Sequence, residues 1–463
     1  MTSARTLPRP RRTHRSPAHR RLRRAAHRAV VAVSAVVLAV TGLTVAQVLQ
    51  APQAQARTTF SGPLMGWSSW SVESSTHPNY GTNWLTEGNI KNAADALSTK
   101  LKSAGYQYVD IDSYWSNGTD GNGVPSADTS RFPDGMAAMA TYIHNDGLKM
   151  GLYDTAGLSQ SVYNSNYPIA GTSCHTQDIA VQPLTATNKW GSNWKIDYSN
   201  PCAQQYIDSI VDTFASWGVD MIKIDGVTAD NVADIQAFSN AIDASGRQMW
   251  LTASAWPVDI SAADGLAPYA NSVRIDTDVE CYCDTVSSWN SSVSARWNDL
   301  PEWLSHVNSN YRPDLDSMPI NNNTGSGVQD GLNDTERQSV MNFWSMASAP
   351  LYVGGDIYFM DSNAVSILSN PEVIAVDQSS INPSQVTGGT LQVWKKVIGS
   401  STYVGVYNLG GSTANITVDW SSVGVSGSAE VRDVDARQDL GAFDGSWTAS
   451  NVPSHGSRLI KIN

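Results

Sequence analysis

The stretch MIKIDGV, residues 221–227, places two charged side chains inside an apolar run. Alternate residues of a β-strand share a face, so Lys223 and Asp225 point the same way while their neighbours supply apolar surface. An ion pair inside a core adds little stability, because the cost of desolvating both charges offsets their attraction. A strand that ends at a cleft explains the pair better. There Lys223 favours the charged form of Asp225, as a nucleophile requires.

Carboxyl groups recur where other apolar runs end. Six of the eight strand-like runs finish at or just before an aspartate: Asp112, Asp154, Asp225, Asp278, Asp316 and Asp356. An aspartate after a strand is also a common helix N-cap, which we expect for Asp356 and regard as an equal alternative for Asp154 and Asp316. Capping alone does not explain aspartates after so many separate elements. We therefore expect several of them to meet in an acidic cleft.

The second charged stretch, SVRIDTD at residues 272–278, supplies a carboxyl group that can act together with Asp225 in such a cleft. Arg274, Asp276 and Asp278 share one face of this strand. Cleavage of a glycosidic bond needs two carboxyl groups, of which one is a nucleophile or base and the other an acid. The spacing predicts Asp278 as the acid partner of Asp225 and leaves Asp276 as the alternative.

The elements that position these residues alternate between strand and helix patterns. Candidate strands cover residues 65–70, 106–112, 149–154, 221–225, 248–254, 272–278, 312–318 and 351–356. Between them, apolar residues recur at helical spacing, as in Ile90, Ala94, Leu97 and Leu101. Eight strands alternating with helices predict an α/β fold, a (β/α)8 TIM barrel whose strand ends converge on one face. A doubly wound open sheet is the alternative.

The sequence changes character near residue 380. Short alternating strand patterns with Gly and Ser turns follow, and no helix is expected there. We predict a catalytic barrel over residues 57–380 and a small C-terminal antiparallel β-sandwich domain over residues 381–463.

The first 56 residues have the features of a secretory signal peptide. Residues 1–28 carry ten arginines and no acidic residue, residues 29–45 are apolar, and residues 54–56 read AQA, a small-x-small cleavage pattern. The apolar run is shorter than the ~20 residues of a membrane-spanning helix. We expect cleavage after Ala56, a secreted extracellular protein, and no membrane association afterwards.

Charge, cysteine and histidine usage narrow the function further. Residues 57–463 hold 20 Lys and Arg against 42 Asp and Glu, a formal charge of −22, which disfavours nucleic acid as a partner. Four cysteines in an exported chain favour disulfides, with Cys174 and Cys202 closing one loop and the pairing of Cys281 and Cys283 left open. The histidines are scattered without the spacing of zinc ligands, so neither a metal nor a cofactor is expected.

Seven motifs occur in an order that resembles a known family. They are MGWSSW (65–70), GYQYVDIDSYW (105–115), RFPDGM (131–136), HNDGLKMGLYDTAG (144–157), WGVDMIKID (217–225), RPDLDSM (312–318) and EVIAVDQ (372–378). Together they resemble glycoside hydrolase family 27, the α-galactosidase and α-N-acetylgalactosaminidase family. The resemblance implies a barrel followed by a β-sandwich and a retaining mechanism without a cofactor.

The resemblance also implies roles for single residues. The aspartate of the family's Lys-x-Asp strand is the nucleophile, here Asp225, with Lys223 binding the sugar. The family's acid/base lies four residues after an arginine, which corresponds to Arg274 and Asp278 and decides against Asp276.

Four further residues are expected at the substrate by the same resemblance. Trp67 is implied as a stacking wall, Asp112 as an acceptor for a sugar hydroxyl, and Tyr153 and Trp256 as residues that line the pocket.

Three positions depart from the family pattern. Ser113 in IDSYW replaces the second aspartate of a pair that binds the C4 and C6 side of galactose. Ala255 in SAWP replaces a glutamate that contacts the C2 hydroxyl, which we expect to enlarge the pocket there. Val227 replaces a cysteine after the nucleophile, so the family's disulfide at that point is absent.

The function expected from the sequence is a secreted retaining exo-glycosidase that removes terminal α-galactosyl-type residues from oligo- or polysaccharides. The alternatives within the family are an α-N-acetylgalactosaminidase, a β-L-arabinopyranosidase and an α-glucan-cleaving relative. The alternatives of other classes are a non-catalytic carbohydrate-binding protein and a surface-anchored adhesion protein. The linkage, the aglycone and the oligomeric state are left open by the sequence.

Overall fold

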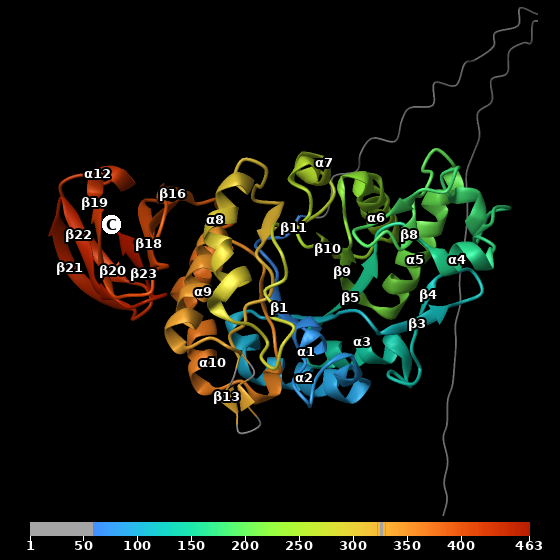
Figure 1. Ribbon diagram of the computed structural model, residues 1–463, viewed down its shortest axis with the longest axis horizontal. Helices are drawn as coiled ribbons and strands as arrows, with labels where there is room; N and C mark the ends of the chain where they lie inside the picture. Colours follow the sequence, from blue (N-terminus) through green and yellow to red (C-terminus); the bar gives the residue numbers. More distant parts are fainter. Residues whose placement is uncertain (1–58, 322, 325–326, 329) are drawn as a thin grey trace, which may run out of the picture. The chain divides into compact units, whose positions relative to one another are not determined.

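The computed structural model describes residues 59–321, 323–324, 327–328 and 330–463 (Figure 1). The predicted signal peptide, residues 1–56, lies outside the described residues. Within the described part of the chain, no helix combines the length and the apolar character needed to cross a membrane.

A parallel sheet of eight strands forms the first and larger part of the described chain, and all eight predicted strands are present. They are β1 (Met65–Ser68), β2 (Tyr108–Ile111), β5 (Lys149–Thr155), β9 (Val219–Asp225), β10 (Trp250–Ala253), β11 (Ser272–Arg274), β12 (Arg312–Asp314) and β15 (Leu351–Val353). Strands β11 and β12 are shorter than predicted, because the chain leaves the sheet before it reaches the aspartates of the site.

The order of the strands shows that the sheet closes into a barrel. They are paired in the order β12-β11-β10-β9-β5-β2-β1-β15, so that the first strand lies between the second and the last. The remaining edges meet through a parallel bridge between Met318 and Val353, in which Met318 N donates to Tyr352 O at 2.7 Å. The predicted TIM barrel is confirmed, and the open doubly wound sheet is wrong.

Helices follow the barrel strands as the apolar stripes predicted. The longer ones are α2 (Glu87–Lys100), α3 (Gly135–Asn145), α5 (Pro201–Trp217), α6 (Val232–Ser245), α8 (Ser294–Trp303) and α9 (Asp334–Ala347). The shorter ones are α1 (Trp70–Ser74), α7 (Ala263–Leu266), α10 (Ser362–Leu368) and α11 (Pro371–Gln378). The stripe of α2 is fully buried. Gly218 ends α5 in a left-handed conformation with φ 97° and leads directly into β9.

A long insertion between β5 and α5 builds one wall above the barrel. It contains β6 (Leu158–Ser159), α4 (Gln160–Ser165), the 3₁₀ helix η3 (Thr176–Ile179), β7 (Ala186–Thr187) and β8 (Asn193–Trp194). The predicted disulfide between Cys174 and Cys202 is present and joins this insertion to the first turn of α5. The insertion is therefore fixed to the helix that precedes β9.

The C-terminal part of the chain is an antiparallel β domain, as predicted. One sheet has the order β16 (Ser384–Thr387), β17 (Leu391–Ile398), β18 (Ser401–Asn408), β23 (Ser457–Ile462), β20 (Ser428–Asp433) and β21 (Gln438–Asp444). A second pairs β19 (Ala414–Asp419) with β22 (Ser446–Val452). Both sheets contribute to one apolar core, which includes Val404, Val418 and Trp447. A one-turn helix that the sequence did not predict, α12 (Trp420–Val423), follows β19.

Candidate active site

A cavity of about 420 Å³ opens at the carboxyl ends of the barrel strands. Most residues predicted for the site line it: Asp112, Tyr153, Lys223, Asp225, Trp256, Arg274 and Asp278. They come from five different barrel strands or from the loops that follow them, and in a TIM barrel this face carries the active site.

Asp225 is the last residue of β9, and its backbone is fixed by the sheet. Thr155 of β5 is its partner in the strand register, and Gly226 N donates to Asp225 Oδ1 at 2.8 Å. Burial raises the pKa of Asp225 and outweighs the opposing effect of Lys223. The carboxyl group is therefore held in one orientation, with Oδ1 on the backbone.

Lys223 pairs with the carboxyl group of Asp112, the residue that follows β2. Its Nζ lies 2.7 Å from Asp112 Oδ2, and both side chains are almost inaccessible to solvent. Burial alone would lower the pKa of Lys223, but the carboxyl groups of Asp112, Asp225 and Asp110 together raise it well above its usual value. The cation that the sequence predicted as the partner of Asp225 is thus shared with Asp110 of β2 and with Asp112, the residue after this strand.

Asp278 lies in the loop after β11 and is held by side chains. Arg274, the last residue of β11, donates to Asp278 Oδ1 at 2.8 Å, and the Tyr282 hydroxyl donates to Oδ2. Burial raises the pKa of Asp278, but Arg274 and Tyr282 together lower it below its usual value. Asp276, the alternative from the sequence, pairs with Arg296 and does not line the cavity.

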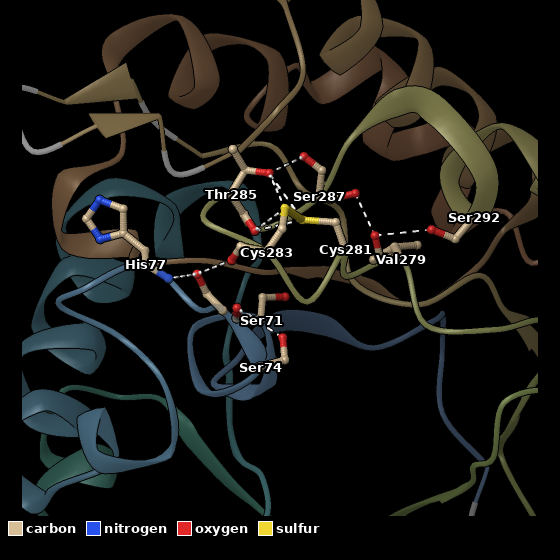
Figure 2. Close-up of a disulfide and its surroundings, with 10 residues drawn as sticks. Ser71, Ser74, His77, Val279, Cys281, Cys283, Thr285, Ser287 and Ser292 are labelled. Carbon is tan, nitrogen blue, oxygen red and sulfur yellow. Dashed lines mark hydrogen bonds between the residues drawn. A yellow bond between two sulfur atoms is a disulfide. The ribbon is translucent and has the colours of Figure 1, made fainter.

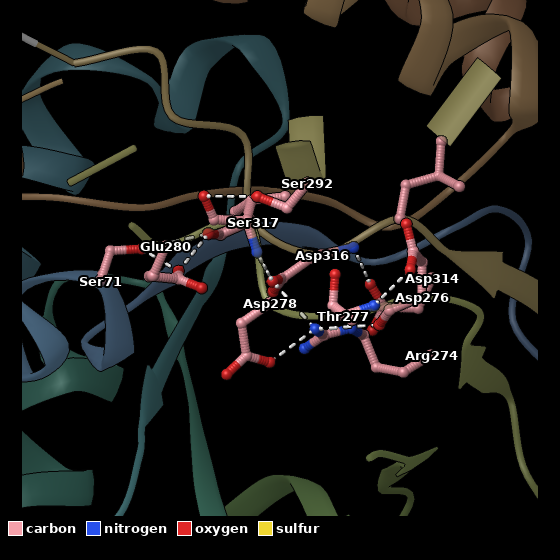
Figure 3. Close-up of polar contacts among 12 residues, drawn as sticks. Ser71, Arg274, Asp276, Thr277, Asp278, Glu280, Ser292, Asp314, Asp316 and Ser317 are labelled. Carbon is pink, nitrogen blue, oxygen red and sulfur yellow. Dashed lines mark hydrogen bonds and ion pairs between the residues drawn. The ribbon is translucent and has the colours of Figure 1, made fainter. Parts of the chain in front are cut away.

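Further acidic groups lie next to Asp278 (Figure 3). Arg274 also contacts Asp316 Oδ2 at 3.0 Å, and Glu280 Oε1 accepts from Ser71 Oγ at 2.5 Å. Burial, followed by repulsion from Asp316 and Asp278, raises the pKa of Glu280 to about 8. Oxygens of Asp278, Glu280 and Asp316 lie within 4.8 Å of one another. Each of the three carboxyl groups accepts from at least one protein donor, and we assign them no metal.

The remaining strand-end aspartates have other roles. Asp356 caps the 3₁₀ helix η7 (Ile357–Phe359) by accepting from Tyr358 N at 3.2 Å, which confirms the predicted N-cap. Asp316 is not a cap, because it joins Arg274 next to the site. Asp154 borders a neighbouring hollow rather than this cavity.

Trp67 is the one predicted site residue that the structure places away from the cavity. Its side chain is 0% exposed, and its Nε1 donates to Gly355 O at 2.7 Å. An indole buried in this way cannot stack on a sugar. Trp70, in α1, lies at the cavity instead. The difference arises because the chain turns from strand into helix directly after Ser68.

Several cavity residues were not singled out from the sequence, namely Trp70, Trp190, Ser254, Thr277 and Tyr282. Trp190 comes from the insertion between β5 and α5, and its ring packs on Trp256 with centroids 4.8 Å apart. It reaches the site over Gly226, where an added Cβ would lie 2.4 Å from the Trp190 ring. No sequence spacing connects Trp190 to the barrel strands, so only the folded insertion reveals it.

Two of the three substituted family positions, Ser113 and Ala255, behave differently. Ser113 lines the cavity, and its hydroxyl lies 3.5 Å from Glu73 Oε2, a buried carboxyl group that the sequence did not indicate. Burial, followed by the Asp112 charge, raises the pKa of Glu73 well above its usual value. Ala255 is 1% exposed and does not line the cavity. Its neighbours Ser254 and Trp256 form the wall. The enlargement expected from the absence of a glutamate at Ala255 stays a prediction.

The pairing that the sequence left open is settled by a disulfide between Cys281 and Cys283 (Figure 2). The residue between them, Tyr282, has φ 52°, a left-handed conformation that is rare for a tyrosine. This bridged loop is the segment that carries the Tyr282 hydroxyl to Asp278.

Two family models match the chain. The model described as alpha galactosidase A matches residues 62–197 and 188–379, and the model described as the alpha galactosidase C-terminal beta sandwich domain matches residues 388–462. The chain belongs to glycoside hydrolase family 27. The resemblance stated from seven motifs is thereby confirmed, and the chain is a glycoside hydrolase of the α-galactosidase type.

Individual family 27 relatives cover nearly all of the described chain. The α-galactosidases of Coffea arabica and Oryza sativa subsp. japonica are each 31% identical, over 86% and 84% of this chain and 93% and 82% of theirs. A GH27 β-L-arabinopyranosidase structure from Geobacillus stearothermophilus in complex with arabinose has a TM-score of 0.76 at 25% identity, over 87% of this chain and 97% of that one. α-Galactosidase I from Mortierella vinacea has a TM-score of 0.68 at 26% identity, with the same coverage.

Proposed function

We propose that this chain is a retaining exo-glycosidase that releases terminal α-galactosyl-type residues, with Asp225 as nucleophile and Asp278 as acid/base. The observation that carries the proposal is that these two carboxyl groups line one cavity at the carboxyl face of the barrel, each near a buried cation. A binding protein needs no such pair. The non-catalytic alternative is therefore disfavoured.

The first half of the reaction forms a covalent intermediate. Asp225 attacks the anomeric carbon while Asp278 gives its proton to the leaving oxygen, so that the C–O bond breaks as the glycosyl-enzyme bond forms. Lys223 and Asp112 are suited to bind sugar hydroxyls, because both line the cavity beside Asp225. Trp190 and Trp256 offer ring faces for stacking.

The second half returns the enzyme to its starting state. Asp278, now a carboxylate, takes a proton from water, whose oxygen attacks the anomeric carbon from the face that the leaving group left. The bond between this carbon and Asp225 breaks, which frees the Asp225 carboxylate. Two inversions at the same carbon retain its configuration. The donors on both oxygens of Asp278 stabilise the carboxylate that remains after the proton is given up in the first step.

The free site favours a different proton distribution from the one the first step needs. Burial raises the pKa of Asp225, whereas Arg274 and Tyr282 lower the pKa of Asp278. Bound substrate opposes both effects. Positive charge that develops on the sugar stabilises the Asp225 carboxylate, and the leaving oxygen competes with the Tyr282 hydroxyl for Asp278.

A second candidate substrate is a β-L-arabinopyranoside. The supporting observation is Ser113, which replaces an acidic residue on the C6 side, together with the similarity to the Geobacillus stearothermophilus β-L-arabinopyranosidase. That sugar has the ring of an α-D-galactoside without its C6 hydroxymethyl group, so it does not need a second acidic partner there. The buried Glu73 behind Ser113 is the compensating group if galactose is bound.

The test is hydrolysis of nitrophenyl glycosides by residues 57–463. The panel contains the α-D-galactoside, α-N-acetylgalactosaminide, β-L-arabinopyranoside and α-D-glucoside, with Asp225→Asn as the inactive control. We expect turnover of the galactoside that is lost in the variant. Preference for the arabinopyranoside would assign the second candidate, and inertness toward the whole panel would overturn the proposal. We also propose secretion through residues 1–56, which the mass of the exported protein tests.

A further inference from the structure

The loop between the two bonded cysteines brings a tyrosine to the candidate acid. Tyr282 lies at the cavity with its side chain 52% exposed, and its hydroxyl donates to Asp278 Oδ2. Neither family resemblance nor spacing assigned this residue a role. It is the one hydroxyl among the described residues for which a hydrogen bond to the Asp278 carboxyl group is found.

The two oxygens of Asp278 have different partners, and this restricts where a catalytic proton can reside. Oδ1 faces the Arg274 guanidinium at 2.8 Å, and a guanidinium has no acceptor for a proton on that oxygen. The transferable proton therefore belongs on Oδ2, the oxygen that Tyr282 holds. A leaving oxygen that receives this proton must approach Oδ2, and so it must lie beside Tyr282.

The bridged loop is fixed at both cysteines (Figure 2). Cys281 N donates to Val286 O at 3.2 Å, and Cys283 O accepts from Thr76 N at 2.7 Å and from Ser75 Oγ at 3.2 Å. The disulfide then leaves a single residue between two fixed points. Tyr282 is held in its left-handed conformation by this arrangement, with its side chain directed to the site.

We propose that Tyr282 is a positioning residue for Asp278 on the leaving-group side of the cavity, and that the Cys281–Cys283 disulfide holds it there. The inference rests on the proposed function, because it concerns the proton that Asp278 transfers. Tyr282 orients the Asp278 carboxyl group, and its exposed ring forms the wall against which the leaving group lies.

The proton balance of the cycle follows from this placement. In the first step the proton on Asp278 Oδ2 moves to the leaving oxygen, which departs as an alcohol. The resulting carboxylate accepts the Tyr282 O–H. In the second step water gives its proton to Oδ2, and the tyrosine hydroxyl, which keeps its own proton throughout, turns to become an acceptor.

Other charged groups around Asp278 affect its ionisation in opposite directions. Arg274 and Lys223 favour its ionised form, whereas Glu280 and Asp316 lie next to it as further acidic groups. The donor that can be removed without disturbing these charges is the Tyr282 hydroxyl, because the rest of its ring faces the cavity and solvent.

The decisive variant is Tyr282→Phe, with Tyr358→Phe as the matched control, since Tyr358 is an exposed tyrosine on η7. Loss of a hydrogen bond donated to a carboxylate raises the pKa of that carboxyl group by about one unit. We expect the basic limb of the kcat/KM profile to move upward by about one unit. We also expect alcohol-leaving substrates to lose about tenfold in kcat, while dinitrophenyl glycosides, which need no protonation, change little. An unchanged basic limb would overturn the inference.

A second readout does not depend on turnover. The ¹³C carboxyl resonance of Asp278, assigned by comparison with Asp278→Asn, should titrate about one unit higher in Tyr282→Phe than in the wild type. If the wild type hydrolyses none of the glycosides, the proposed function fails, and this titration still decides whether Tyr282 controls Asp278. The same pKa for Asp278 in both proteins would show that Tyr282 does not control Asp278.

The role of the disulfide is tested by Cys281→Ser/Cys283→Ser, with Cys174→Ser/Cys202→Ser as its control. We expect the first pair to shift the basic limb in the same direction as Tyr282→Phe, and to add no further shift when the two changes are combined. The control pair should leave the limb in place. If the basic limb of the kcat/KM profile does not shift in Cys281→Ser/Cys283→Ser, the loop holds Tyr282 without its disulfide.

Discussion

Asp225 is the last residue of a seven-residue strand, whereas Asp278 lies four residues beyond a strand of three. The backbone of Asp225 is fixed by β5, and its Oδ1 accepts from the next backbone N–H. Asp278 instead depends on the side chains of Arg274 and Tyr282. One carboxyl group is positioned by the sheet and the other by side chains in a bridged loop.

The two sides of the site also differ in their disulfides. Cys174–Cys202 joins the insertion on the Asp225 side to the barrel, and Cys281–Cys283 constrains one residue on the Asp278 side. A nucleophile must remain in line with one carbon atom, whereas an acid/base must change its protonation during the cycle. Rigid backbone suits the first requirement, and exchangeable hydrogen-bond donors suit the second.

The largest expected effects distinguish the two carboxyl groups directly. Asp225→Gly and Asp278→Gly should each lose about 10⁴-fold in kcat on an alcohol-leaving substrate. On a dinitrophenyl glycoside, whose leaving group needs no proton, azide should restore turnover in both, because it fills the space that each carboxyl group vacates. The restored Asp225→Gly should yield the glycosyl azide of inverted configuration, and Asp278→Gly the retained one. If NMR shows the same glycosyl azide anomer from both variants, the assignment of Asp225 as nucleophile and Asp278 as acid/base is wrong.

The two disulfides should differ in their contribution to stability. Cys174→Ser/Cys202→Ser opens a loop with a sequence separation of 28 and should lower the free energy of unfolding by about 3–4 kcal/mol. Cys281→Ser/Cys283→Ser opens a separation of only 2 and should lower it by only about 1–1.5 kcal/mol. Urea unfolding checks both values. Equal losses would mean that the Asp278 loop also supports the fold.

Gly226→Ala tests the rigidity of the Asp225 side. Gly226 has φ 75°, and an added Cβ would meet the Trp190 ring at 2.4 Å. Because Gly226 N also orients Asp225, we expect about a 10²-fold loss in kcat/KM, the size expected when a reacting group is misplaced by about 1 Å. Gly246→Ala, at a positive φ with open space around it, is the control for backbone strain alone. Equal activity losses in the two variants would contradict the account.

The smallest expected effect is a pH dependence of stability that comes from two buried carboxyl groups, one on each side of the site. Burial raises the pKa of Asp110 to about 7 and that of Glu280 to about 8. Each has one buried oxygen for which no partner is found among the described residues.

A raised pKa means that the folded protein binds the proton more tightly than the unfolded chain. Stability should therefore fall as the pH rises between about 4 and 8. We expect Tm to be about 5 °C higher at pH 5.5 than at pH 8, and Asp110→Asn and Glu280→Gln each to reduce this difference. Scanning calorimetry at the two pH values measures it. A Tm that rises toward pH 8 would show that these groups are ionised when folded.

Much of the fold was predictable from local pattern. Apolar runs, helical stripes and the Gly218 helix end located all eight strands and the helices between them, because these signals lie within single elements. Strand ends were less well predicted. The chain leaves β11 at Arg274 to carry Asp278 into a loop, and alternation of residue types does not show where sheet pairing stops.

The candidate site was predictable where it rests on strands. Lys223 and Asp225 share a strand face, and the strand end carries them to the cavity with Asp112. Trp67 was expected at the cavity and is buried, because all four residues of β1 are buried and the chain reaches the cavity only in α1, at Trp70. Trp190 and Glu73 reach the site from an insertion and a short helix, and no spacing in the sequence indicates either.

The sequence by itself determined the barrel, the β domain after it, the family, and the two carboxyl groups near buried cations. These depend on periodicity and on residues a few positions apart. Only the tertiary structure decided that Lys223 pairs with Asp112 rather than Asp225, that Cys281 bonds to Cys283, and that Tyr282 holds Asp278. Such contacts depend on distances between loops, which the folding of the whole chain sets.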